Sequence, residues 1–80
     1  MRPKKDGISN CLADLRRQRG CSAAELAESV GVSRQTIHAI EANTYIPNTA
    51  LALRLAGVLE VTVEEIFQMS SEPAVSRSNI

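Results

Sequence analysis

The polar side chains that closely follow Gly31 are suited to hydrogen bonding. They are Ser33, Arg34, Gln35, Thr36 and His38. An Arg guanidinium can bond both acceptors on the major-groove edge of guanine, and a Gln amide can bond the donor and the acceptor on that edge of adenine. Short hydroxyl side chains bond phosphate groups or cap a helix. These residue types indicate recognition of a polar surface without covalent chemistry.

Catalysis and metal binding have little support in the residue types. His38 is the single histidine, and it has no clustered partner for a metal ion and no place in a Ser–His–Asp set. Cys11 and Cys21 fall where the apolar pattern expects small hydrophobic residues, so we interpret them as reduced structural thiols. We therefore expect no enzyme, no metal and no cofactor. For His38 we expect a contact with DNA or solvent, and a pH-dependent role stays open.

The elements that must position these residues are helices. Apolar residues recur at helical spacing in five segments, at about 9–19, 22–30, 33–42, 48–59 and a short one at 62–67. The stretches "SAAE" and "TVEE" are capping boxes that start the second and fifth segments. No two alternating runs exist that would pair into a sheet. The sequence predicts an all-α fold with an aliphatic core.

The break between Val30 and Ser33 has the features of a tight corner. Gly31 can adopt the positive φ that such a turn requires, and Val32 can drop into the core beneath it. Ser33 then caps the next helix. Two helices joined by a short turn that contains Gly meet at about 90–120°. The spacing therefore predicts a helix-turn-helix corner.

The helix at 33–42 has one apolar face and one polar face. Ile37 and Ile40 fix the direction of the core, and Gln35 then lies at the centre of the opposite face. His38 and Ala39 lie beside Gln35, and Arg34 lies at the edge. Such a face can enter the major groove with its N-terminal end first. The alternative is an ordinary solvated start of a helix.

Charge is divided unequally along a chain that is neutral overall. Residues 1–19 hold six basic residues against two acidic ones, a net charge of +4, and residues 20–80 carry the balancing −4. A protein divided in this way can present one basic face and one acidic face. No apolar run approaches the roughly 18 residues that span a bilayer, and no signal peptide is visible. We expect a cytoplasmic protein without a membrane partner.

The order of these features resembles the phage repressor and Cro-type (XRE-like) helix-turn-helix family of prokaryotic DNA-binding regulators. The resemblance covers residues 12–67 and rests on "ELAESVGVS", "IHAIE" and "LRLAGVLEVTVEEIF", together with Leu15, Arg16 and Pro47. It implies a compact five-helix domain of the lambda-repressor-like type. It also implies sequence-specific binding to double-stranded DNA, usually as a homodimer, in a bacterial, archaeal or phage setting.

The resemblance also implies roles for single residues. Base contacts fall to Arg34, Gln35, His38 and Ala39. Phosphate contacts fall to Ser22, Ser33, Thr36, Thr44 and Arg16. Arg16 and Glu41 correspond to a family ion pair that ties the first helix to the end of the third, and the alternative is two independent surface charges.

Two departures from the family pattern concern the phosphate contacts. Ala23 stands where the family commonly has a Gln, and Asn43 and Thr44 stand where Gly or Lys is common. One subunit is therefore expected to bind weakly. We expect a two-fold dimer, with the exposed Leu53 and the fourth and fifth helices as its candidate interface.

Three segments are expected along the chain: a flexible basic arm at 1–7, the DNA-binding domain at 8–69, and a flexible tail or linker at 70–80. Arg2, Lys4 and Lys5 would give the arm its contacts with DNA, or the segment is a disordered start. Two alternative functions remain at this stage. One is a protein-interaction module, such as an antitoxin or adaptor. The other is the N-terminal DNA-binding part of a larger ligand-sensing regulator whose effector the sequence leaves unknown.

Overall fold

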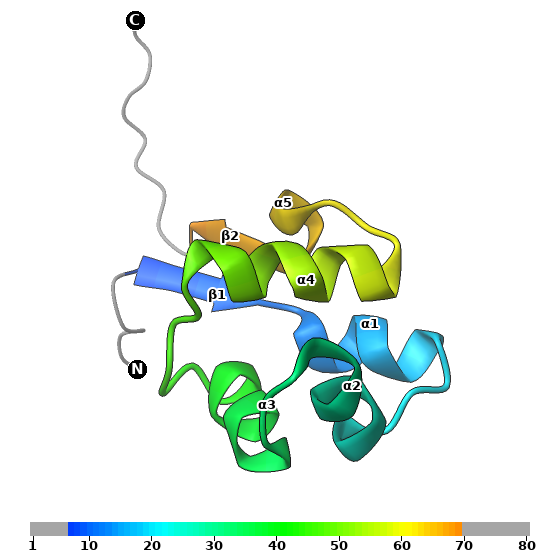
Figure 1. The fold of residues 1–80 in the computed structure, drawn as a ribbon. Helices are drawn as coiled ribbons and strands as arrows, with labels where there is room; N and C mark the ends of the chain where they lie inside the picture. The colour runs from blue at the N-terminus through cyan, green and yellow to red at the C-terminus, as the bar shows by residue number, and fades with distance from the viewer. Residues whose placement is uncertain (1–6, 70–80) are drawn as a thin grey trace, which may run out of the picture.

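Residues 7–69 are described by the computed structural model, and they form five helices and two short strands (Figure 1). The order is β1 (Ile8–Asn10), α1 (Leu12–Gln18), α2 (Ala23–Val30), α3 (Arg34–Glu41), α4 (Thr49–Leu59), α5 (Val63–Ile66) and β2 (Phe67–Met69). Residues 1–6 of the expected arm and the expected tail at 70–80 lie outside the described residues. The five predicted helices are present.

The core is aliphatic and is shared by all five helices. The largest side chains with less than 2% exposure are Leu12, Leu26, Ile37, Ile40, Leu55, Leu59 and Ile66. Burying one such side chain stabilises a fold by about 1.5–3 kcal/mol. Figure 1 shows α2 and α3 next to each other on one side of α4, with α5 on the other side, and α2 packs against both α3 and α4. The inward face of α3, with Ile37 and Ile40, therefore packs directly against the core.

Side-chain caps fix where four of the helices begin. The caps are Ser22, Ser33, Asn48 and Thr62, and each accepts a hydrogen bond from a backbone N–H one turn ahead. Both predicted capping boxes are complete, at Ser22 and at Thr62. A cap of this kind contributes about 1 kcal/mol. The start of α3 is therefore set by the sequence itself and not only by its packing.

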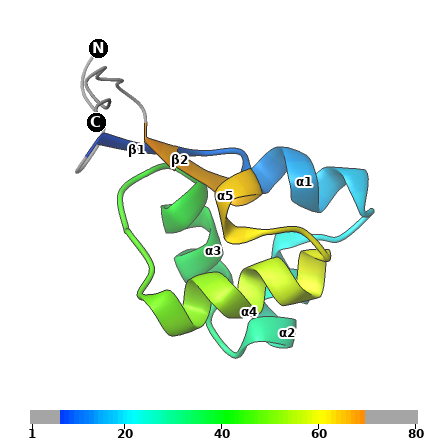
Figure 2. The same ribbon diagram turned by 90° about the horizontal axis from the view of Figure 1, so that it is seen from above.

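The expectation that the chain has no sheet is wrong. β1 and β2 pair antiparallel, with Ile8 opposite Met69 and Asn10 opposite Phe67. Figure 2 shows the two strands running side by side past the end of α5. Strands of three residues are too short to show an alternating pattern, and their partners lie at opposite ends of the domain. The sheet therefore leaves no periodic signal in the sequence.

The sheet also corrects two helix boundaries. The first helix was expected from residue 9 but begins at Leu12, because residues 8–10 form β1. The fifth ends at Ile66, because Phe67 already belongs to β2. The backbone N–H of Cys11 donates to the carbonyl of Ile66 at 3.0 Å and so extends the pairing into the start of α1. The two ends of the domain are thereby joined.

The corner between α2 and α3 has the predicted geometry. Gly31 ends α2 with φ of 81° and ψ of 31°, in the left-handed region. The N–H groups of Gly31 and Val32 donate to the carbonyl of Ala27 at 2.9 and 3.0 Å. Ala27 is buried and Val32 packs against the core from the turn. A Cβ atom added at Gly31 would meet no atom within 4 Å, so only the backbone conformation demands glycine there.

Replacing Gly31 is therefore expected to cost stability through φ alone. Gly31→Ala should destabilise the fold by roughly 1–2 kcal/mol, the cost of the left-handed region for a residue with a Cβ. Gly31→Val should cost more, because a β-branched residue is more strained there. Gly57→Ala is the matched control, since a Cβ at Gly57 in α4 also meets nothing within 4 Å. It should stabilise the helix by about 0.5–1 kcal/mol. Urea unfolding of the three variants measures the difference, and equal stabilities for both alanine variants would contradict the assigned φ.

Candidate nucleic-acid interface

The outward face of α3 presents an Arg, a Gln and a His together. Ile37 and Ile40 are 0% and 1% exposed and hold the other face against the core. Arg34, Gln35 and His38 are all exposed. Neither Arg34 nor Gln35 has a side-chain hydrogen bond within residues 7–69. Their donors and acceptors are therefore available to a ligand at the N-terminal end of α3.

Ala39, in the last turn of α3, is hydrogen-bonded to Thr44, which lies just after the helix ends. Ala39 is half-buried, and its carbonyl accepts from the backbone N–H of Thr44 at 2.9 Å and from the Thr44 hydroxyl at 3.2 Å. A hydroxyl group has a single proton to donate. In this arrangement the Thr44 hydroxyl donates its one proton to the Ala39 carbonyl. It can therefore accept a hydrogen bond but cannot donate one to a phosphate oxygen.

Ser33 and Thr36 form a second local pair, at the start of α3. Ser33 Oγ accepts from the Thr36 N–H at 3.1 Å, and the two hydroxyl oxygens are 3.0 Å apart. One hydroxyl must donate to the other at this distance, so the pair keeps one free O–H. Ser33 is exposed and Thr36 half-buried. The pair can offer one donor to a phosphate beside the exposed face of α3.

Ser22 caps α2 and keeps its own hydroxyl proton. Its Oγ accepts from the Glu25 N–H at 3.0 Å, while Glu25 Oε1 accepts from the Ser22 N–H at 2.9 Å. The Glu25 carboxylate beside it would repel a phosphate, which weakens this site. Ala23, in the place of the family's Gln, is 7% exposed and belongs to the core cluster. The start of α2 therefore offers few phosphate donors.

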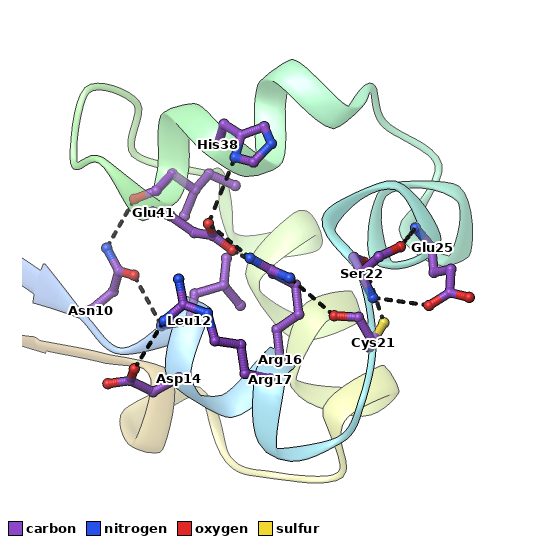
Figure 3. A network of polar contacts seen from close by, with 11 residues as sticks. Asn10, Leu12, Asp14, Arg16, Arg17, Cys21, Ser22, Glu25, His38 and Glu41 are labelled. Carbon is purple, nitrogen blue, oxygen red and sulfur yellow. Dashed lines mark hydrogen bonds and ion pairs between the residues drawn. The ribbon is translucent and has the colours of Figure 1, made fainter.

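Arg16 and Glu41 form an ion pair behind α3 (Figure 3). Arg16 Nε donates to Glu41 Oε2 at 2.8 Å, and Arg16 Nη1 donates to the carbonyl of Cys21 at 3.1 Å. The two side chains are only 11% and 12% exposed, so they are not independent surface charges. The hydrogen bond to Glu41 raises the pKa of Arg16 above its ordinary value, although burial opposes this. The geometry favours the ion pair over the phosphate contact expected of the same residue.

His38 approaches the same carboxylate from the exposed side. Its Nδ1 lies 3.8 Å from Glu41 Oε1, beyond hydrogen-bond length, and its side chain is 57% exposed. No group of three or more potential metal ligands occurs among residues 7–69. His38 therefore remains on the outward face of α3, next to a carboxylate already held by Arg16.

Asn10 is a positioning residue that sequence reasoning missed. Its Nδ2 donates to the carbonyl of Ile40 at 2.9 Å and to Asn43 Oδ1 at 3.0 Å, while its Oδ1 accepts from the Leu12 N–H at 3.0 Å. Figure 3 shows this amide between the start of α1 and the end of α3. The one available signal was an Asn two residues ahead of an apolar helix start, which is a common local turn.

Breaking the Arg16–Glu41 pair is expected to destabilise the fold strongly. Arg16→Met leaves the Glu41 carboxylate buried without its partner, which costs about 3–5 kcal/mol. The control is Arg17→Met on the same helix, because the ion pair of Arg17 with Asp14 is 68% and 72% exposed. That change should cost about 0–1 kcal/mol. Chemical denaturation measures both.

The double variant Arg16→Met/Glu41→Met tests the cause. Its stability should return most of the way to that of the wild type, because no charge is then left buried. A double variant as unstable as the single one would contradict this account.

The chain is similar in sequence to known helix-turn-helix proteins over most of its length. The family model described as "Helix-turn-helix" matches residues 12–66. The HTH-type transcriptional regulator YgzD of Bacillus subtilis is 37% identical over 65 residues, covering 81% of this chain and 98% of that protein. An HTH-type transcriptional regulator of Methanothermobacter thermautotrophicus is 43% identical over 64 residues, covering 79% of this chain and 93% of its own.

Solved structures share the arrangement of helices. The N-terminal DNA-binding domain of SinR from Bacillus subtilis superposes with a TM-score of 0.61 at 31% identity, covering 66% of this chain and 78% of that one. A Bacteroides fragilis protein reaches a TM-score of 0.71 at 21% identity, covering 76% of this chain and 98% of that one, and this likeness concerns the fold alone. Within residues 7–69, no helix has the length and apolar character needed to cross a membrane.

Proposed function

The chain belongs to the helix-turn-helix family of DNA-binding transcriptional regulators, which are not enzymes, and we propose that it reads duplex DNA by placing α3 in the major groove. One observation carries this proposal. The exposed face of α3 offers unengaged Arg34 and Gln35 side chains, while Ile37 and Ile40 hold its other face against the core. A helix held from behind can present base-reading groups in a fixed orientation.

The position of the two side chains on α3 supports this orientation. Arg34 and Gln35 are the first two residues of the helix after the Ser33 cap. In helix-turn-helix proteins the N-terminal residues of the second helix contact base edges. Arg34 is suited to the two acceptors of guanine and Gln35 to the donor and acceptor of adenine. His38, one turn later, would contact the next base or the backbone, and half-buried Ala39 would offer a methyl contact.

The charges of the described domain make the attraction to DNA weak on its own. Residues 7–69 hold five arginines against seven acidic residues. Arg16, Arg17 and Arg19 are paired with Glu41, Asp14 and Glu60. On α3 itself, Arg34 is the one arginine or lysine. We infer that the basic residues at the start of the chain, outside the described residues, supply further contacts with phosphates.

We further propose that the protein acts as a homodimer in the cytoplasm, where prokaryotic DNA lies. One helix reads only a few base pairs, and the phosphate donors described above are few. Two copies related by a two-fold axis would read half-sites about 10 base pairs apart, or multiples of that distance. The expected operator is an inverted repeat.

Exchange of the reading side chains is expected to relax specificity. Arg34→Ala and Gln35→Ala should each weaken binding to a site selected from a random duplex pool by about 1–3 kcal/mol and loosen preference at one base position. Gln18→Ala, at the exposed end of α1, is the matched control and should change nothing. Binding to matched and scrambled duplexes measures this. Intact matched binding in both α3 variants would reject α3 as the reading helix and favour the protein-interaction alternative.

The basic start of the chain is expected to attract DNA without preference for any base sequence. Changing Arg2, Lys4 and Lys5 together to Gln should lower the affinity for matched and for scrambled duplexes by a similar factor. The slope of log affinity against log salt should become shallower by about 0.9 for each phosphate that the variant no longer neutralises. The measurement is a salt titration of both duplexes with the triple variant. An unchanged slope would mean that these residues do not contact DNA.

A further inference from the structure

The imidazole of His38 lies between a carboxylate oxygen and the exposed face of α3. Its Nδ1 is 3.8 Å from Glu41 Oε1, and the side chain is 57% exposed. Figure 3 shows Nδ1 turned toward Glu41 and the second ring nitrogen, Nε2, turned away from it. His38 follows Gln35 by three residues and Arg34 by four, so it shares their exposed face of the helix. Nε2 is therefore the ring atom that a ligand on this face would meet.

Glu41 Oε1 has room for a further hydrogen bond. Arg16 Nε donates to the other carboxylate oxygen, Oε2, at 2.8 Å, whereas Arg16 Nη2 reaches Oε1 only at 3.4 Å. Within residues 7–69, no other side-chain donor is bonded to Oε1. The Glu41 side chain is 12% exposed, so water has little access to this acceptor. A rotation of the exposed imidazole that shortens the distance from 3.8 Å to about 2.8 Å would supply the missing donor.

We propose that Glu41 fixes which nitrogen of His38 carries the proton, and that His38 thereby reads one base position differently in its two protonation states. This inference rests on the proposed function, because it assigns a role to one side chain of the helix proposed to read DNA. When the ring is neutral, its proton stays on Nδ1, facing the carboxylate, and Nε2 presents a lone pair to DNA. When the ring is protonated, both nitrogens are donors and Nε2 presents an N–H. The same atom changes from acceptor to donor as pH falls.

The two states of His38 suit opposite base edges in the major groove. A bare Nε2 can accept from the amino group of cytosine, whereas Nε2–H can donate to the ring or carbonyl acceptor of guanine. Adenine has both a donor and an acceptor on this edge and fits either state. The preferred base opposite His38 is therefore cytosine at high pH and guanine at low pH. His38 thus chooses between the two orientations of a G·C pair according to pH.

Three charged neighbours set the balance between the two forms of the ring. The Glu41 carboxylate favours the imidazolium, while Arg16, which reaches this carboxylate from α1, opposes it. Arg34, on the same face of α3, opposes it as well. DNA phosphates favour the imidazolium, so binding to guanine takes up a proton. Glu41 is the one carboxylate within 4 Å of the ring among residues 7–69. Other titratable groups on α1 and α2, which pack against α3, and on the segments that adjoin them are Asp14, Arg17, Cys21, Glu25, Glu28 and Tyr45.

The position of the proton in the free protein is the first test, and it needs no substitution. His38 is the single histidine, so its ring nitrogens give one set of signals in the NMR spectrum of the isotope-labelled full chain. At about pH 8 the neutral ring should carry its proton on Nδ1. An imidazole free in water carries it mainly on Nε2. A proton found mainly on Nε2 of His38 would overturn the role of Glu41.

Arg16→Met/Glu41→Met is the matched variant for the same signal. It leaves no charge buried, so its fold should be retained, while His38 loses its carboxylate. The proton should return to Nε2. A proton that stays on Nδ1 in the folded double variant would overturn the assignment to Glu41.

Selection of the full chain's sites from a random duplex pool, at about pH 5.5 and at about pH 8, tests the change of base. One position of the selected site should change from guanine at the lower pH to cytosine at the higher pH. Two duplexes that differ only in the orientation of that pair should show opposite trends. Affinity for the guanine duplex should rise as pH falls, and affinity for the cytosine duplex should decrease. The ratio of the two affinities should change by about tenfold, as expected when one hydrogen bond is exchanged for a mismatch.

His38→Gln is the control for this ratio, because a Gln amide has a donor and acceptors at either pH. The ratio should stay constant between the two pH values in this variant. A wild-type ratio that is equally constant would overturn the proposal. An equal gain of affinity for both duplexes at low pH would also overturn it, because that result indicates a contact of His38 with phosphate.

The two proposals fail in different ways. Intact matched binding in both Arg34→Ala and Gln35→Ala would remove α3 from the DNA and overturn both proposals. Discrimination that is lost in these two variants, together with a wild type whose preferred bases do not change with pH, would overturn only the role of His38.

Discussion

The orientation of α3 depends on a nearly buried ion pair. Arg16 reaches from α1 to the Glu41 carboxylate at the end of α3, and its Nη1 donates to the carbonyl of Cys21, just ahead of α2. Three helices are thereby fixed to one guanidinium group. A charge pair gives little net stability when it is buried, but it tolerates few alternative geometries. The pair lies behind the exposed face of α3 and not on it, so it can set the angle of α3 while leaving that face open to the proposed DNA ligand.

Local chemistry made most of the fold predictable. The capping boxes at Ser22 and Thr62, the cap at Ser33 and the left-handed Gly31 all depend on contacts within a few residues, and each is present. The exposed face of α3 is predictable from helical periodicity, because Ile37 and Ile40 point inward and leave Gln35 on the opposite side. The Arg16–Glu41 pair was reached through resemblance to a family, since spacing alone cannot bring residues of two helices together.

Features that depend on distant partners were not predictable. The β1–β2 pairing joins the two ends of the domain, and the role of Asn10 depends on carbonyls at the end of α3. The side-chain contacts of Thr44 with Ala39 and of Thr36 with Ser33 are local, but residue types alone do not indicate them, and the phosphate contacts expected of both residues stay predictions. The residue type determines which hydrogen bonds a side chain can make. Which of them form within the fold depends on the neighbouring residues.

The exposed side chains of α3 contribute little to the domain that carries them. Arg34 and Gln35 have no side-chain hydrogen bond within residues 7–69, and the caps and core contacts of the helix come from other positions. Selection for stability and selection for target sequence therefore act on separate sets of residues. Under the proposed function, a lineage can exchange these side chains, and with them the preferred DNA sequence, without first restoring a weakened fold. The same separation makes α3 a position at which new binding preferences can be installed on an unaltered scaffold.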